Sequence, residues 1–203
     1  MTWCLMLDVD GVVVNGRPED GRSWATDLER DLGISLERLR TCFFDPHWEA
    51  IVTGQADLLA VLEACMPVLA AEQTAQGLLD YWFERDSAVN EAILATCGEL
   101  RRQGVVIYLA TNQDHLRARH LMDSLRLRDH VGGMIYSAEI GARKPQRAFF
   151  DAALKTSGTR PDRTLLVDDT KANVEAARAA GWHAIHWQPG ARLQLLLDGS
   201  GLF

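Results

Sequence analysis

Basic residues are scarce relative to acidic ones in this sequence. The 203 residues include 21 Lys and Arg against 28 Asp and Glu, which gives a formal net charge of −7. A broad nucleic-acid-binding surface needs clustered excess cations, and this balance does not provide them. We therefore expect no nucleic-acid partner.

Long apolar runs are absent as well. No stretch approaches the roughly 18 uninterrupted apolar residues that a membrane-spanning helix requires. The apolar residues 1–7 lack a basic flank and reach Asp8 too soon for a secretion signal, so they are predicted to form a buried strand. These absences predict a cytoplasmic protein with no membrane partner.

Cysteine is sparse and scattered. The four cysteines include no C-x-x-C pair, and a chain of this length does not need disulfides to stabilise its core. We expect reduced thiols inside the protein. The sequence gives no indication of the oligomeric state.

Five short apolar runs alternate with amphipathic stretches along the chain. The runs are predicted to be strands and comprise residues 3–8, 105–111, 134–137, 164–168 and 183–187. Such alternation is typical of a parallel sheet with helices on both faces, so we predict a doubly wound, Rossmann-like α/β fold. Gly104 and Gly181 are expected to end helices, and Pro145 to begin one.

Residues 23–85 interrupt this alternation, because they have helical periodicity and no β-branched run. Turn signals within them predict four or five short helices. We expect an α/β core domain of residues 1–16 and 87–203, and a small all-helical domain of residues 17–86. Because the insertion leaves the chain soon after the first strand, it is expected to lie over the carboxyl end of the sheet.

Two aspartates follow the first predicted strand in the motif Asp8-Val9-Asp10-Gly11. Ligands of open α/β sheets bind outside the carboxyl ends of the strands, so both carboxylates are expected to face that crevice. Close carboxylates repel each other unless a cation intervenes, and such hard oxygen ligands suit Mg²⁺. Taken alone, the motif is equally compatible with a strand-end turn in which Asp10-Gly11 forms the bend.

Polar side chains also occur at the end of the second predicted strand, and a lysine precedes Pro145. Thr111 and Asn112 offer a hydroxyl and an amide that could hold phosphate oxygens. The alternative is that one of them is the N-cap of the next helix. Lys144 lies in the loop before Pro145, where a lysine can reach an anionic centre as a point charge.

A second acidic pair, Asp168-Asp169, ends the fourth predicted strand. Burying two carboxylates without a counter-charge is costly, so a bound metal would explain the pair. The alternative is that Asp169 or Thr170 caps the helix that follows.

The four strand-end sites together combine acids, small polar donors and one lysine, the set that phosphoryl transfer requires. The chain resembles the hydrolases of the haloacid dehalogenase superfamily that carry a helical cap of the first type. The resemblance covers nearly the whole chain. It rests on motifs in the family's order, namely Asp8-Val9-Asp10-Gly11-Val12, Thr111-Asn112, Lys144-Pro145, and Asp168-Asp169 with Asn173.

This resemblance implies covalent catalysis. Asp8 would attack phosphorus and form an aspartyl-phosphate, which replaces one difficult displacement with two easier ones. Asp10 would protonate the leaving oxygen and later deprotonate the attacking water. Thr111 and Asn112 would bind the phosphoryl oxygens, and Lys144 would neutralise the nucleophile and the developing charge.

The resemblance also implies a magnesium site. The ligands would be the Asp8 carboxylate, the backbone carbonyl of Asp10 and Asp169. Asp168 would either ligate Mg²⁺ directly or order a bound water.

Asp10 favours phosphate esters as substrates, because relatives that cleave carbon–halogen bonds lack an acid at this position and use no metal. We therefore predict a phosphatase for a small phosphorylated metabolite, such as a sugar phosphate. The alternatives are a phosphomutase of the same superfamily and, less favoured, a haloacid dehalogenase or a binding protein without turnover.

Substrate choice is expected to depend on the helical insertion. The candidate residues are Asn15 and Arg17 near its start, and His47, Trp48 and Glu49 after the Asp45-Pro46 turn. For the tryptophans of this region, packing inside a small helical bundle is the favoured role.

Overall fold

The computed structural model describes residues 2–70 and 72–202. Its centre is a five-stranded parallel sheet with the order β3-β2-β1-β4-β5. The strands are β1 (Cys4–Leu7), β2 (Val106–Thr111), β3 (Gly133–Tyr136), β4 (Thr164–Asp168) and β5 (His183–His186). All five predicted strands are therefore present, each within one residue of its predicted bounds.

The central strand β1 is buried over its whole length, as expected for a strand whose two faces are both covered by helices. Its side chains alternate between two hydrophobic clusters, with Leu5 and Leu7 on one side and Cys4 and Met6 on the other. The register pairs Leu7 with Leu109 of β2 and with Val167 of β4. The carboxyl ends of these three strands therefore lie at one edge of the sheet.

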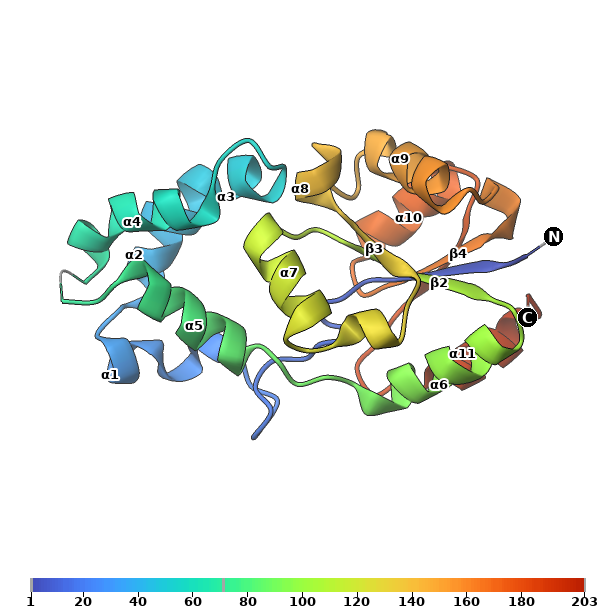
Figure 1. Ribbon diagram of the computed structural model, residues 1–203, viewed down its shortest axis with the longest axis horizontal. Helices are drawn as coiled ribbons and strands as arrows, with labels where there is room; N and C mark the ends of the chain where they lie inside the picture. Colours follow the sequence, from blue (N-terminus) through green and yellow to red (C-terminus); the bar gives the residue numbers. More distant parts are fainter. Residues whose placement is uncertain (1, 71, 203) are drawn as a thin grey trace.

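Helices cover both faces of the sheet, which confirms the doubly wound α/β fold (Figure 1). One hydrophobic cluster includes residues of α6 (Glu91–Arg102), α7 (His115–Asp123) and α11 (Leu193–Ser200). The other includes residues of α9 (Arg147–Ser157) and α10 (Lys171–Ala179). Short elements between them are η3 (Leu127–Asp129), α8 (Ser137–Ile140) and η4 (Pro161–Arg163).

The residues between β1 and α6 form a separate group of helices, drawn at the left of Figure 1. This helical segment contains η1 (Trp24–Asp27), α1 (Leu28–Leu32), α2 (Leu36–Leu39), the π-helical η2 (Arg40–Phe44), α3 (Asp45–Val52), α4 (Leu58–Leu69) and α5 (Ala75–Arg85). It has its own hydrophobic cluster, formed mainly by its own residues. Side chains of Asp57 and Thr74 cap α4 and α5, which explains where these helices begin.

Two chain segments join the helical segment to the sheet. They pair through Asn15 N to Ala88 O at 2.9 Å and through Asn90 N to Val13 O at 2.8 Å. The division into two domains at residues 16 and 87 stays a prediction.

The prediction for Pro145 was wrong, whereas those for Gly104 and Gly181 were correct. Pro145 follows a cis peptide bond in a turn, and α9 begins only at Arg147 with Gln146 as its N-cap. Gly104 and Gly181 follow α6 and α10 with positive φ. The four cysteines are free, and three of them are buried. Within the described residues, no helix is both long enough and apolar enough to cross a membrane.

Candidate active site

The strand ends bring together side chains that are distant in the sequence. Asp8 follows β1, Thr111 ends β2 and Asp168 ends β4. The Lys144 ammonium lies between two of them, 3.0 Å from Asp8 Oδ1 and 2.5 Å from Asp168 Oδ2. Asp8, Asp168 and Lys144 therefore form one buried cluster.

Hydrogen bonds fix both the side chain and the backbone of Lys144, in addition to its two ion pairs. Its Nζ donates to Ala110 O at 2.6 Å. The Asn112 side chain accepts from Lys144 N at 2.8 Å and donates to Lys144 O at 3.0 Å. Burial alone would lower the pKa of Lys144, but Asp8 and Asp168 outweigh it and raise that pKa. Lys144 is therefore a fixed cation beside Asp8.

Asn112 thus has a local role that the sequence did not indicate. Both polar atoms of its side chain bind the Lys144 backbone, so it orients the lysine loop. Phosphate binding by this side chain stays a prediction, since it would compete with these two hydrogen bonds. Thr111 is buried at the end of β2.

Asp8 is buried, and its Oδ1 accepts a hydrogen bond from Val9 N at 2.8 Å. Burial raises the pKa of Asp8 to about 7; Lys144 opposes this shift, and the nearby Asp168 adds to it. Among the described residues, Lys144 is the one cation paired with this buried carboxylate, so a further cation would stabilise its ionised form.

Asp10 lies two residues further on and faces a partner that sequence analysis did not identify. Gln113 Nε2 donates to Asp10 Oδ2 at 2.6 Å. Burial raises the pKa of Asp10 to about 6; Arg117 opposes this shift, and Asp86 adds to it. Gln113 directly follows Asn112, so its place just beyond the end of β2 was the one available signal.

Three carboxylates are close enough to share a cation. Ligand oxygens of Asp8, Asp168 and Asp169 all lie within 4.8 Å of one another. Gly11 permits this arrangement, because its φ is +80° and a Cβ there would clash with the Asp169 carboxylate. The donor set consists of hard oxygen ligands with excess negative charge, which fits a divalent cation such as Mg²⁺.

Asp168 is the most constrained of the three acids. Its carboxylate accepts from Asn173 Nδ2 at 3.0 and 3.1 Å, and from Thr170 N at 2.8 Å. Asp169 is exposed, and its backbone carbonyl accepts from His186 Nε2 at 2.8 Å. Asp169 therefore has the carboxylate more available to a metal.

The helix-capping alternatives are not supported. Asp114, and not Thr111 or Asn112, caps α7 by accepting from Leu116 N and Arg117 N. Thr170 occupies the N-cap position of α10, but no side-chain hydrogen bond caps that helix.

Comparisons with known proteins agree with this geometry. The model of the family described as haloacid dehalogenase-like hydrolase matches residues 4–181. The chain belongs to this family. The sequence is 25% identical over 189 residues to a phosphoglycolate phosphatase from Pseudomonas putida, covering 87% of this chain and 66% of the relative. It is 36% identical over 88 residues to a sesquiterpene phosphatase from Aspergillus oryzae, covering 43% of this chain and 45% of that protein.

A solved structure of a HAD family enzyme from Bacteroides thetaiotaomicron, in complex with magnesium and inorganic phosphate, has a similar fold. Its TM-score is 0.80 at 17% identity, and the match covers 97% of this chain and 99% of that one. The matched parts of the two curated phosphatases span less than two thirds of their own lengths. The fold and the family of this haloacid dehalogenase-like hydrolase are therefore established.

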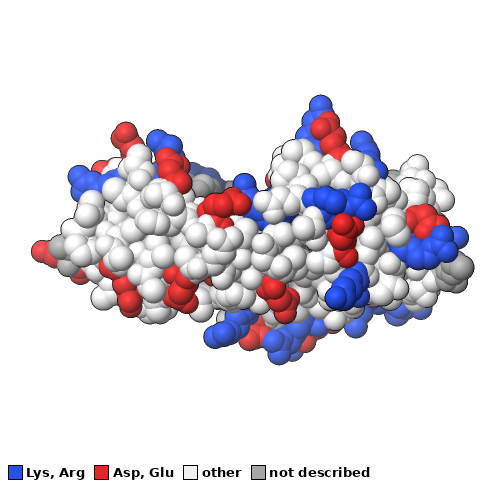
Figure 2. Space-filling view, turned by 90° about the horizontal axis from the view of Figure 1, so that it is seen from above, with Lys and Arg blue, Asp and Glu red and all other residues white. Residues whose placement is uncertain are grey.

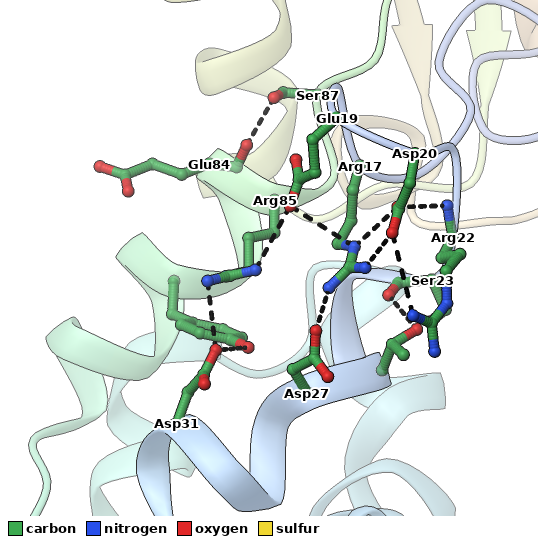
Figure 3. A network of polar contacts seen from close by, with 12 residues as sticks. Arg17, Glu19, Asp20, Arg22, Ser23, Asp27, Asp31, Glu84, Arg85 and Ser87 are labelled. Carbon is green, nitrogen blue, oxygen red and sulfur yellow. Dashed lines mark hydrogen bonds and ion pairs between the residues drawn. The ribbon is translucent and has the colours of Figure 1, made fainter.

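In this haloacid dehalogenase-like hydrolase, Arg17 does not join the strand-end residues. It is buried in a network between the linkers and the helical segment (Figure 3). Its guanidinium contacts Asp20, lies 2.5 Å from Asp27 Oδ2 and 3.5 Å from Glu19 Oε1. The hydrogen bond from Arg17 lowers the pKa of Asp20 to about 2.

The other candidate residues for substrate choice differ in burial and in the residues that they contact. Asn15 is exposed and donates to Val12 O at 3.1 Å. His47 is half-buried, and Trp48 contacts the rings of Phe44 and Trp82 in an aromatic group, as the packing role predicts. Glu49 of α3 contacts the sheet-containing part through an ion pair with Arg143.

Proposed function

We propose that the protein is a magnesium-dependent phosphatase that hydrolyses a small phosphate ester through an aspartyl-phosphate at Asp8. The observation that carries the proposal is the position of Asp8, which lies beside Lys144 and within one cluster with Asp168 and Asp169. Phosphatases among its relatives, and magnesium with phosphate in a structural neighbour, support this reaction class.

In the first step, the Asp8 carboxylate attacks phosphorus and the bond from phosphorus to the ester oxygen breaks. The Asp10 carboxylic acid gives its proton to that oxygen, so the substrate leaves as an alcohol. Lys144 reduces the repulsion between the Asp8 carboxylate and the anionic phosphate, and Asn112 keeps the lysine loop in place.

In the second step, water attacks the phosphorus of the aspartyl-phosphate. Asp10, now a carboxylate, takes a proton from the water, and the bond from phosphorus to the Asp8 oxygen breaks. Inorganic phosphate leaves, and both aspartates return to their starting states. Thr111 is proposed to hold phosphoryl oxygens through both steps.

A magnesium ion would be held by the carboxylates of Asp8 and Asp169 and by the backbone carbonyl of Asp10. Asp168 would ligate it directly or through water. When bound, the ion supplies positive charge against the phosphoryl oxygens. The proposal includes residues 17–86 as a cap that excludes water and selects the leaving group, and a cytoplasmic location remains our expectation.

The test is hydrolysis of para-nitrophenyl phosphate by the purified protein with Mg²⁺, compared with Asp8→Asn and with Asp162→Asn. Asp162 is an exposed aspartate paired with Arg160, away from the strand ends, so its variant controls for a lost surface carboxylate. We expect turnover in the wild type and the control, and none in Asp8→Asn. Full turnover by Asp8→Asn would exclude the covalent mechanism.

A substrate panel then addresses specificity and the phosphomutase alternative. The names of the relatives span phosphoglycolate, phosphoserine and sesquiterpene phosphates, so the panel includes these together with sugar phosphates and nucleotides. Release of inorganic phosphate supports a phosphatase. A sugar phosphate whose phosphoryl group changes position without release would identify a mutase.

A further inference from the structure

The buried Gln113 makes a part-buried polar contact with the exposed Asp10 that the family motifs do not explain. Its side chain is 3% exposed, and its Nε2 donates to Asp10 Oδ2 at 2.6 Å across 103 positions of sequence. Among the described residues, no other side chain hydrogen-bonds the Asp10 carboxylate. The orientation of this carboxylate therefore depends on one amide.

The backbone of Gln113 is itself fixed. Its carbonyl accepts from Ser137 Oγ at 3.3 Å and from Ala138 N at 3.2 Å, which ties it to the first turn of α8. Ser137 is fully buried. The next residue, Asp114, caps α7. The amide thus projects from a backbone that is held on both sides.

Arg117 is a nearby cation, but its contacts prevent it from orienting the Asp10 carboxylate in place of Gln113. The guanidinium of the buried Arg117 donates to the carbonyls of Phe83 and Asp86, and it lies 3.3 Å from Asp86 Oδ2. Arg117 is thereby bound to the end of α5 and to Asp86 directly after it, so the direct contact with Asp10 comes from Gln113.

We propose that Gln113 is a positioning residue that orients the Asp10 carboxyl group toward the oxygen of the leaving group. This inference rests on the proposed phosphatase function. Without the amide, Asp10 can rotate about its side-chain bonds, and proton transfer requires hydrogen-bond geometry with the reacting oxygen. Loss of Gln113 should therefore slow the first step, formation of the aspartyl-phosphate, only for substrates whose leaving oxygen needs a proton.

The test compares two leaving groups in Gln113→Met, which keeps the side-chain length and removes the donor. An alkyl phosphate needs the proton of Asp10, whereas 2,4-dinitrophenyl phosphate releases a stable phenolate without one. We expect kcat/KM, which reports only the steps up to the aspartyl-phosphate, to fall about 10–100-fold for the alkyl ester, a part of the usual 10²–10⁴-fold effect of a general acid. For the dinitrophenyl ester we expect less than about a two-fold change in kcat/KM, because proton transfer to its leaving group contributes little to the first step.

Two controls distinguish a loss of Asp10 orientation from a general loss of structure or activity. Gln76→Met removes an equivalent contact, the 2.7 Å hydrogen bond from Gln76 to Asp80 on the surface of α5, and should leave both esters unaffected. In an Asp10→Asn background, Gln113→Met should cause no further loss with the alkyl ester, because both changes remove the same step.

Equal loss of kcat/KM for both esters, or additive losses in the double variant, would overturn the proposal. If Gln113→Met does not fold by circular dichroism, Gln113→Asn replaces it, since its shorter amide keeps a polar group but cannot reach Asp10 at the same distance. The same selectivity is expected there, and its absence overturns the proposal. A wild-type protein that hydrolyses neither ester would instead refute the proposed phosphatase function.

Discussion

Glu49 of α3 and Arg143 of the loop before Lys144 form an ion pair, with 2.9 Å between Oε2 and Nε. The pair links the helical segment directly to the loop that carries the buried lysine. A second contact lies close by, where Gly54 approaches the carbonyl of Ala138 so closely that a Cβ would clash. In Figure 2 the surface is hollowed between the two parts of the molecule, and acidic and basic side chains meet at this junction.

Glu49→Gln should weaken closure of the helical segment with little effect on stability. Both partners are solvent-accessible, at 60% for Glu49 and 35% for Arg143, so the pair contributes at most about 1 kcal/mol to unfolding. We expect a rise of several-fold in KM, a change in Tm near zero, and a weaker salt dependence of kcat/KM. Steady-state kinetics at two ionic strengths measures this.

The matched control for that variant is Asp151→Asn, which breaks the exposed pair of Asp151 with Arg147 on α9. It should leave KM unchanged. If both variants behaved alike, the Glu49 contact would have no special role at the junction.

Removal of metal should abolish activity and lower stability together. A ligand at 100 times its Kd stabilises a folded protein by about 2.7 kcal/mol, so excess Mg²⁺ should raise Tm relative to the EDTA-treated protein. Asp169→Asn should lose most of this rise, because it removes a carboxylate of the cluster. Asp10→Asn should retain it while losing turnover, since only the backbone carbonyl of Asp10 is assigned to the metal. A normal shift in Asp169→Asn would remove it from the ligand set.

Gly11→Ala should prevent metal binding for a steric reason. Gly11 has a φ of +80°, and its added Cβ would meet the Asp169 carboxylate. Gly33 also has a positive φ, +69°, but open space around it, so Gly33→Ala adds backbone strain of about 1–2 kcal/mol without a clash. We expect both variants to lose stability, and only Gly11→Ala to lose the Mg²⁺-dependent rise in Tm.

The strands and the buried cluster were predictable because they follow from local patterns. Each apolar run has the length and composition of a buried strand, and parallel strands place their carboxyl ends at one edge. Asp8 and Asp168 could therefore be expected to lie close together. The same patterns predicted the five strands and the helices that cover the two faces of the sheet.

The partners of these residues were not predictable in the same way. Asn112 binds the backbone of Lys144, 32 positions away, and Gln113 binds Asp10, 103 positions away. Neither contact leaves a periodic or spaced pattern, because each depends on the exact course of a loop. Pro145 illustrates the same limit, since its turn separates it from the helix that it was expected to begin.

Arg17→Met should lower Tm and reduce kcat/KM equally for all substrates. The buried guanidinium joins Asp20, which precedes η1, to Asp27 of η1, and Glu19 in turn pairs with Arg85 at the end of α5. Loss of Arg17 leaves these acids without the cation that they share. This loss should destabilise the start of the helical segment and leave the geometry of the strand-end site unchanged.

Arg22→Met is the control for Arg17, because the exposed Arg22 side chain lies 3.9 Å from Asp20, whereas the backbone contacts of Arg22 with Asp20 and Arg17 do not depend on its side chain. It should change neither Tm nor kcat/KM. Thermal unfolding and the substrate panel distinguish the two possible roles of Arg17. A loss of kcat/KM confined to substrates with an anionic leaving group, at unchanged Tm, would mean that Arg17 contacts the substrate directly. A residue that only stabilises the helical segment cannot discriminate between leaving groups.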